Sequence, residues 1–84
     1  MSRDDDVFLA GDPEMLIEIA RGTMPFGKYA GTPLLDLPDP YLVWFEEKGW
    51  PSGRLGELLQ TTLEIKVAGL VPMVRRLRTT RPRG

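Results

Sequence analysis

Apolar residues near the start of the chain recur at helical spacing. The positions that share one face are Met15, Leu16, Ile19 and Ala20. The Asp12-Pro13 pair before them favours a helix start, because the aspartate oxygen can accept hydrogen bonds from free backbone amides and proline loses none at the first helical position. Gly22 is a typical residue to end a helix. The pattern therefore predicts a helix at about residues 13–21.

The segment 23–38 has turn residues too often for a helix. Its glycines are at 27 and 31, and its prolines are at 25, 33 and 38. This spacing predicts two very short strands joined by a tight turn, which is a β-hairpin. Gly27 and Gly31 are then expected at positive φ or in crowded positions, while Phe26 and Leu34 point inward.

A second helix is predicted to start at Asp39-Pro40, which repeats the pairing of a capping residue with a proline. It should run through Lys48 and end at Gly49. Its buried side is expected to hold the large apolar residues of this stretch, namely Tyr41, Leu42, Trp44 and Phe45.

A third helix is predicted after the elbow at residues 50–53. Its apolar residues are numerous enough to cover more than one neighbour, and they are Leu55, Leu58, Leu59, Leu63, Ile65, Val67 and Leu70. Gly69 and Pro72 weaken the helix, so its end is expected near residues 68–71. We expect this helix to form the centre of the fold.

Together these elements predict a single α+β domain at residues 12–71. It would lie between a flexible acidic segment at 1–11 and a flexible basic tail at 72–84. A chain of 84 residues buries only roughly 60 to 65 per cent of the surface that its unfolded form exposes. The large apolar residues must then meet in one small cluster or be shared with a second copy, so a homodimer is an open alternative.

Charge is unevenly distributed, although the net charge is only −1. The acids near the start are Asp4, Asp5, Asp6, Asp12, Glu14 and Glu18, whereas the far end carries Arg75, Arg76, Arg78, Arg81 and Arg83 with no acid among them. Two interpretations are open. The ends are solvated tails, or the arginines attract an anionic partner.

The residue inventory excludes most familiar catalytic sites. The sequence has no histidine and no cysteine, so it lacks the residues for thiol catalysis, for thiolate metal sites and for the common acid–base pairs. We therefore expect no enzyme, no cofactor and no metal. Asp36 and Asp39 could hold a divalent ion only with backbone oxygens, and carboxylates beside prolines are more typical of turns and caps. The segment 27–31 lacks the spacing of a phosphate-binding loop.

The composition favours a cytoplasmic location. The absence of cysteine fits a reducing compartment. The first six residues are acidic where a secretory signal would be basic and then apolar. No apolar run approaches the roughly 18 residues that a membrane span needs, so we expect neither export nor membrane insertion.

Lys28 and Tyr29 are the first candidates for a binding surface. A cation beside an aromatic ring can contact a phosphate and stack on a base, as in proteins that bind single strands. The alternative is that Tyr29 packs in the core and Lys28 is merely solvated. Trp50 lies in an elbow between two helices, where it either covers the core or contacts a partner, whereas the helical spacing of Trp44 favours the core.

An ordered series of motifs resembles a family of small bacterial proteins described as putative quorum-sensing-regulated virulence factors. The series spans about residues 24–70 and reads M-P-F-G-K-Y-x-G-x-P-L-x-D-L-P-x-x-Y-L-x-W-F, then K-G-x-P, L-G-E-L-L, E-I-K and G-L. The resemblance implies a regulatory association and no particular reaction.

A shorter pattern resembles the module at the C-terminus of exodeoxyribonuclease X and related exonucleases. It is F-G-K-x-x-G followed by P-x-x-Y-L-x-W, and it covers about residues 24–45. This resemblance implies a link to DNA. Ala30 and Thr32 stand where such modules often place lysines, which leaves Lys28 as the one cation of the turn.

Two functions follow as hypotheses. The first is a non-catalytic accessory protein that associates with nucleic acid through Lys28, Tyr29 and an arginine cluster, which consists of Arg75, Arg76 and Arg78. The second is a protein-interaction or self-association module, in which Trp50 and exposed parts of the third helix form the interface.

Overall fold

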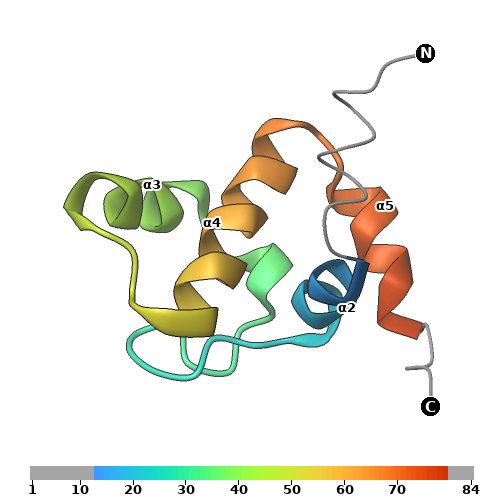
Figure 1. Cartoon of the computed structure of the whole chain (residues 1–84), viewed down its shortest axis with the longest axis horizontal. Coiled ribbons are helices and arrows are strands. Elements are labelled where there is room, and N and C mark those ends of the chain that lie inside the picture. Colours follow the sequence, from blue (N-terminus) through green and yellow to red (C-terminus); the bar gives the residue numbers. More distant parts are fainter. Residues whose placement is uncertain (1–12, 80–84) are drawn as a thin grey trace.

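Every regular element in residues 13–79, the part of the chain that the computed structural model describes, is a helix (Figure 1). The elements are α2 (Pro13–Arg21), η1 (Leu34–Asp36), α3 (Asp39–Lys48), α4 (Gly53–Val67), α5 (Val71–Arg75) and η2 (Arg76–Thr79), of which η1 and η2 are 3₁₀ helices. The expected α+β class is therefore wrong. The described residues contain one isolated β-bridge, between Thr23 and Pro33, and no strand.

The predicted hairpin does not grow beyond one bridge, because the backbone groups that would form the next rung are used in turns. The backbone of Met24 pairs with that of Thr32 through one hydrogen bond of 2.9 Å, next to the bridge between Thr23 and Pro33. The next rung would need the Thr32 N–H to donate to the Met24 carbonyl. The Thr32 N–H donates instead to Tyr29 C=O at 2.9 Å, and Met24 C=O accepts from the Gly31 N–H at 2.7 Å, so the ladder ends there. Residues 24–32 instead form a turn-rich loop, and the chain enters η1 directly after Pro33.

The two loop glycines adopt the backbone conformation that the sequence predicts. Gly27 and Gly31 have φ values of 79° and 87°, in the region that residues with a Cβ rarely occupy. Leu34 is buried, as predicted. Phe26 is 48 % exposed, so the prediction that it points inward is wrong.

Helices α2, α3 and α4 lie where the apolar spacing predicts them. α2 and α3 match the predicted ranges, and α4 ends at Val67, one residue before the predicted interval. The start of α3 differs in detail, because its N-cap is Pro38 and not Asp39. The Asp39 carboxylate instead pairs with the Lys66 ammonium of α4 at 3.1 Å.

The core is a single cluster around α4, which packs against α2, α3, η1 and α5. Its buried apolar residues are Ile19, Ala20, Met24, Leu34, Leu35, Leu37, Leu42, Phe45, Leu59, Leu63, Ile65 and Val74. The central position predicted for this helix is confirmed. Where α4 begins, Gly56 permits a close approach, because a Cβ there would overlap the carbonyl oxygen of Pro51.

The C-terminal part of the described chain is helical. α5 and η2 pack against α2, and Val74 is only 2 % exposed. Pro72 lies in the first turn of α5, where its missing N–H costs no hydrogen bond. The folded unit therefore extends past residue 71, and the flexible tail predicted from residue 72 is wrong for residues 72–79. The predictions for residues 1–11, for the Asp12 cap and for residues 80–84 lie outside the described residues.

No helix within residues 13–79 combines the length and the apolar character needed to cross a membrane.

Candidate functional site

An aromatic hollow lies between the 24–32 loop and the first turns of α3. It has a volume of about 500 Å³ and is lined by Lys28, Tyr29, Pro38, Pro40, Tyr41 and Trp44. We call this set of residues the aromatic hollow. Its surface is mostly ring and proline carbon, with Lys28 as its one charged lining residue.

The local backbone explains why these side chains meet. Hydrogen bonds within the turn, from Ala30 N–H to Gly27 C=O at 3.1 Å and from Thr32 N–H to Tyr29 C=O at 2.9 Å, fix the loop that carries Lys28 and Tyr29. The other side of the hollow comes from the start of α3. Tyr41 and Trp44 are three residues apart, so they project from the same side of that helix.

The rings of the hollow differ in exposure: Tyr29 and Tyr41 are half-buried and pack against the core, whereas Trp44 is exposed, as is Lys28. The Tyr29 and Tyr41 ring centroids are 4.7 Å apart with a tilt of 59°, and the Lys28 ammonium lies 5.5 Å from the Tyr29 centroid. Trp44 is 51 % exposed and meets Phe45 edge-on at 5.1 Å. Such accessible π-faces beside a cation can stack on a flat, unsaturated ligand.

Partial burial, and after it the neighbouring Tyr29, raise the pKa of the Tyr41 hydroxyl above its ordinary value. The hydroxyl therefore stays protonated throughout the physiological range. It can donate a hydrogen bond to a ligand in the hollow.

The structure separates Trp44, predicted for the core, from Trp50, for which the sequence leaves core packing and partner contact both open. Trp44 is exposed, so its assignment to the core is wrong. On a helix with 3.6 residues per turn, Trp44 lies about 160° from Leu42, and this separation is a signal that sequence reasoning missed. Trp50 is half-buried and its ring stacks on Phe45 at 6.1 Å with an angle of 18°.

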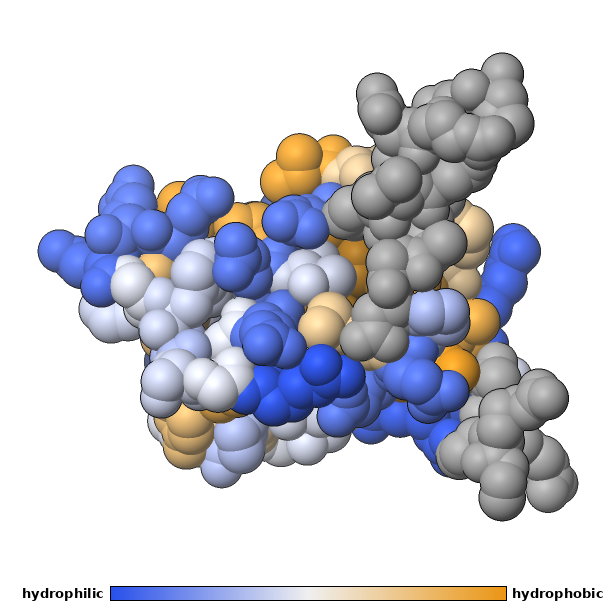
Figure 2. All heavy atoms as spheres, in the orientation of Figure 1, coloured by the Kyte–Doolittle hydropathy of each residue, from blue (hydrophilic) through white to orange (hydrophobic). Residues whose placement is uncertain are grey.

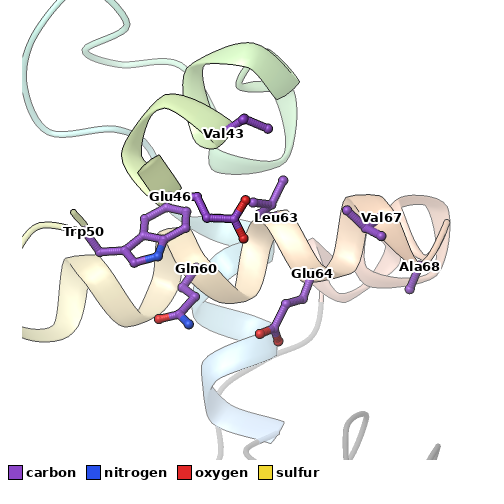
Figure 3. Close-up of a pocket in the computed structure, with 8 residues that line it drawn as sticks. All are labelled: Val43, Glu46, Trp50, Gln60, Leu63, Glu64, Val67 and Ala68. Carbon is purple, nitrogen blue, oxygen red and sulfur yellow. The ribbon is translucent and has the colours of Figure 1, made fainter. Parts of the chain in front are cut away.

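Trp50 lines a second feature, a groove of about 540 Å³ between α3 and α4 (Figure 3). The residues that line it are Val43, Glu46, Trp50, Gln60, Leu63, Glu64, Val67 and Ala68, and we call it the α3–α4 groove. Its lining shares no residue with the aromatic hollow. The structure therefore brings Lys28 and Tyr29 together but does not place Trp50 with them.

The candidate arginines lie on α5 and η2, at the end of the molecule away from α3 (Figure 1). The Arg75 guanidinium pairs with Asp36 at 2.9 Å. Arg78 donates from Nε to the carbonyl oxygen of Ala20 at 3.4 Å, and Arg76 is exposed. These three residues do not line the aromatic hollow, so the structure does not join them with Lys28 in one site.

The candidate metal pair is engaged in other contacts. Asp36 pairs with Arg75, and Asp39 pairs with Lys66. Among residues 13–79, no group of three or more metal-ligating side chains lies close enough to hold an ion. The arrangement therefore favours a structural role for both carboxylates.

Comparisons with known proteins found matches that cover most of the described chain. A family model described as "Putative quorum-sensing-regulated virulence factor" matches residues 12–77. The chain is 54 % identical over 68 residues to "Uncharacterized protein YpeB" of Escherichia coli strain K12, covering 80 % of this chain and 94 % of that protein. A protein with the same name from Escherichia coli O157:H7 gives the same values. No solved structure is significantly similar to the chain.

Proposed function

The chain belongs to the family of putative quorum-sensing-regulated virulence factors, and we propose that it acts as a non-catalytic, cytoplasmic accessory protein that binds single-stranded nucleic acid in the aromatic hollow. Unpaired bases would stack on Tyr29, Tyr41 and Trp44. The Lys28 ammonium would contact a neighbouring phosphate.

The observation that carries this proposal is that one short segment of the chain supplies every residue that lines the hollow. All the residues that line it fall between 28 and 44. This segment lies within residues 24–45, for which a resemblance to the C-terminal module of exodeoxyribonuclease X stays a prediction from the sequence pattern alone. One short stretch of chain thus supplies a cation and three aromatic rings to one surface, which supports the proposal.

The chemistry of the hollow favours unpaired bases over a duplex. Stacking of a base on an aromatic side chain contributes about 1–3 kcal/mol and tolerates any base, because every base has a π-face. A duplex hides these faces and offers mainly phosphates. Lys28 is the one cation of the hollow, so phosphate contacts alone would supply little affinity.

The arginine cluster has a secondary place in the proposal. Arg75 is already paired with Asp36, and the cluster lies on the α5 side of the molecule. We expect its contribution to be limited to general attraction of a polyanion, which salt screens. The hollow itself would decide between single and double strands.

Fluorescence anisotropy with labelled oligonucleotides tests the proposal. We expect single-stranded DNA or RNA to bind more tightly than a duplex of the same length. Trp44→Ala should weaken single-strand binding about 5- to 100-fold, from the loss of one stacked base. Lys28→Ala should weaken binding less and lower the slope against log salt by about 0.7.

Phe26→Ala is the matched control for Trp44→Ala. Phe26 is an aromatic residue of similar exposure, 48 % against 51 %, and it does not line the hollow. Its substitution should leave binding unchanged. Equal losses in both variants, or no binding to single strands at low salt, would contradict the proposal.

The alternative function, a protein-interaction module, involves a different surface. It depends on Trp50 and the exposed face of α4, which meet in the α3–α4 groove. The two functions are compatible, because the groove and the hollow share no lining residue.

A further inference from the structure

The α3–α4 groove is lined along α4 by one face of the helix, on which Val67 and Ala68 are exposed apolar residues, Gln60 and Glu64 are exposed polar residues, and Leu63 is buried. The residues that α4 and its C-cap contribute are Gln60, Leu63, Glu64, Val67 and Ala68, at the spacing i, i+3, i+4, i+7 and i+8. This spacing marks one continuous face of a helix, the kind that normally packs against a neighbouring helix. Val67, on this face, is 81 % exposed.

Val43 and Trp50 complete the apolar surface from the α3 side. Val43 is 38 % exposed, and Figure 3 shows it across the groove from Leu63 and Val67. Trp50 closes one end of the groove, while Val67 and Ala68 line the other. Figure 2 shows hydrophobic atoms on the surface over the C-terminal end of α4. An apolar surface of this kind is typical of an interaction site.

The charged residues of the groove are all acidic. Glu46 and Glu64 are exposed, and no lysine or arginine is among the lining residues. In Figure 3 the Glu46 side chain reaches from α3 toward Leu63, so a carboxylate stands beside the apolar residues of the groove. A ligand with apolar residues flanked by cations would complement both properties.

We infer that the α3–α4 groove binds a basic amphipathic helix of a partner protein. The groove follows α4 from Gln60 to Ala68, about 12 Å at 1.5 Å per residue, which suits two to three turns of a helix. Residues 13–79 offer no sheet edge to which an extended peptide could add. Helix-in-groove binding is therefore the mode that this fold supports.

A second copy of the chain fits the groove less well than a partner. The arginines of the described chain lie mainly on α5 and η2, which are five and four residues long. The apolar side of α5 is already used, because Val74 is buried against the core. Met73, 44 % exposed, is the one large apolar residue that these two short elements expose, which is less than a groove lined by Val43, Trp50 and Val67 would need. This inference concerns a different surface from the hollow and is independent of nucleic-acid binding.

The test uses a designed peptide of about 14 residues, roughly 21 Å as a helix. It carries leucines at i, i+3, i+4 and i+7 and lysines and arginines elsewhere, and a second peptide has glutamates in place of every cation. Binding is followed by Trp50 fluorescence in a Trp44→Phe background, at physiological salt. We expect the basic peptide to bind with a blue shift and the acidic peptide to bind at least about tenfold more weakly.

Groove variants separate this site from general attraction. The double variant Glu46→Lys, Glu64→Lys should weaken binding of the basic peptide about tenfold, since both charge pairs become repulsive. Glu47→Lys, on the next residue of α3 and outside the groove lining, is the matched control and should have little effect. Val67→Asp should abolish binding, and because Val67 is exposed, circular dichroism should show an unchanged fold.

Three outcomes would overturn the inference. The first is that the basic and acidic peptides bind equally well, or that neither peptide binds. The second is an equal effect of the Glu46→Lys, Glu64→Lys variant and the Glu47→Lys control. The third is a concentration-dependent dimer in light scattering that Val67→Asp disperses, because a second copy would then be the occupant.

Discussion

Two tryptophans, one on α3 and one just after it, lie on two different surface features. Trp44 is half-exposed in the aromatic hollow, whereas Trp50 is stacked on Phe45 and lines the α3–α4 groove. Phe45 contacts both rings from the core side. The indole of Trp44 is thus available for stacking, while that of Trp50 serves both packing and the groove.

Tyr41 provides a prediction at this scale, because its pKa is raised in the folded chain. In the unfolded chain the hydroxyl loses its proton near pH 10, while the folded chain retains it to higher pH. Above about pH 10 the unfolded state therefore binds fewer protons, and the free energy of unfolding should fall as pH rises. The fall should end once the pH passes the pKa of the folded state.

Urea unfolding at about pH 8 and about pH 11 measures this effect. Tyr41→Phe should lose less stability between the two pH values than the wild-type protein does, since it lacks the shifted group. An equal or greater loss in Tyr41→Phe would show that burial of this hydroxyl does not affect stability.

At the scale of elements, the packing of α5 against the rest of the fold is the feature most open to a stability test. Val74 is 2 % exposed, while Met73 beside it is 44 % exposed. Val74→Ala should lower the free energy of unfolding by about 1.5–3 kcal/mol, because two buried methyl carbons are lost and a cavity remains. Met73→Ala should change it by less than about 1 kcal/mol. Similar values for the two variants in urea unfolding would mean that α5 does not dock as described.

The helices could be predicted from sequence because their signals are local. Apolar spacing and capping residues place α2, α3 and α4 to within about two residues. Turn residues predict the hairpin, but they do not show that the Thr32 N–H donates to Tyr29 C=O within the loop and not to Met24 across it. α5 was missed because Pro72 was read as a helix breaker, when it occupies the first turn of a helix.

The candidate site could be predicted only in part. Lys28 and Tyr29 are adjacent in sequence, so their proximity needs no tertiary information. Whether Trp44 faces the core or the solvent depends on which side of α3 meets α4, and the position of the arginine cluster depends on the docking of α5. Both are properties of the tertiary fold, which helix propensity does not encode.

At the scale of the whole molecule, three surfaces occupy different places. The aromatic hollow lies by the 24–32 loop and α3, and the acidic-rimmed groove lies between α3 and α4. The arginine cluster lies on α5 and η2, at the end of the molecule away from α3 (Figure 1). A protein with separate surfaces for a nucleic acid and for a protein helix can bring the two together.

The aromatic hollow is the central claim, and an NMR titration of isotope-labelled protein with a short single-stranded oligonucleotide tests it most directly. The largest shifts should occur at Lys28, Tyr29, Tyr41 and the Trp44 indole N–H, with little change at Val67 in the groove. Shifts confined to the α5 and η2 arginines, or none at low salt, would contradict it.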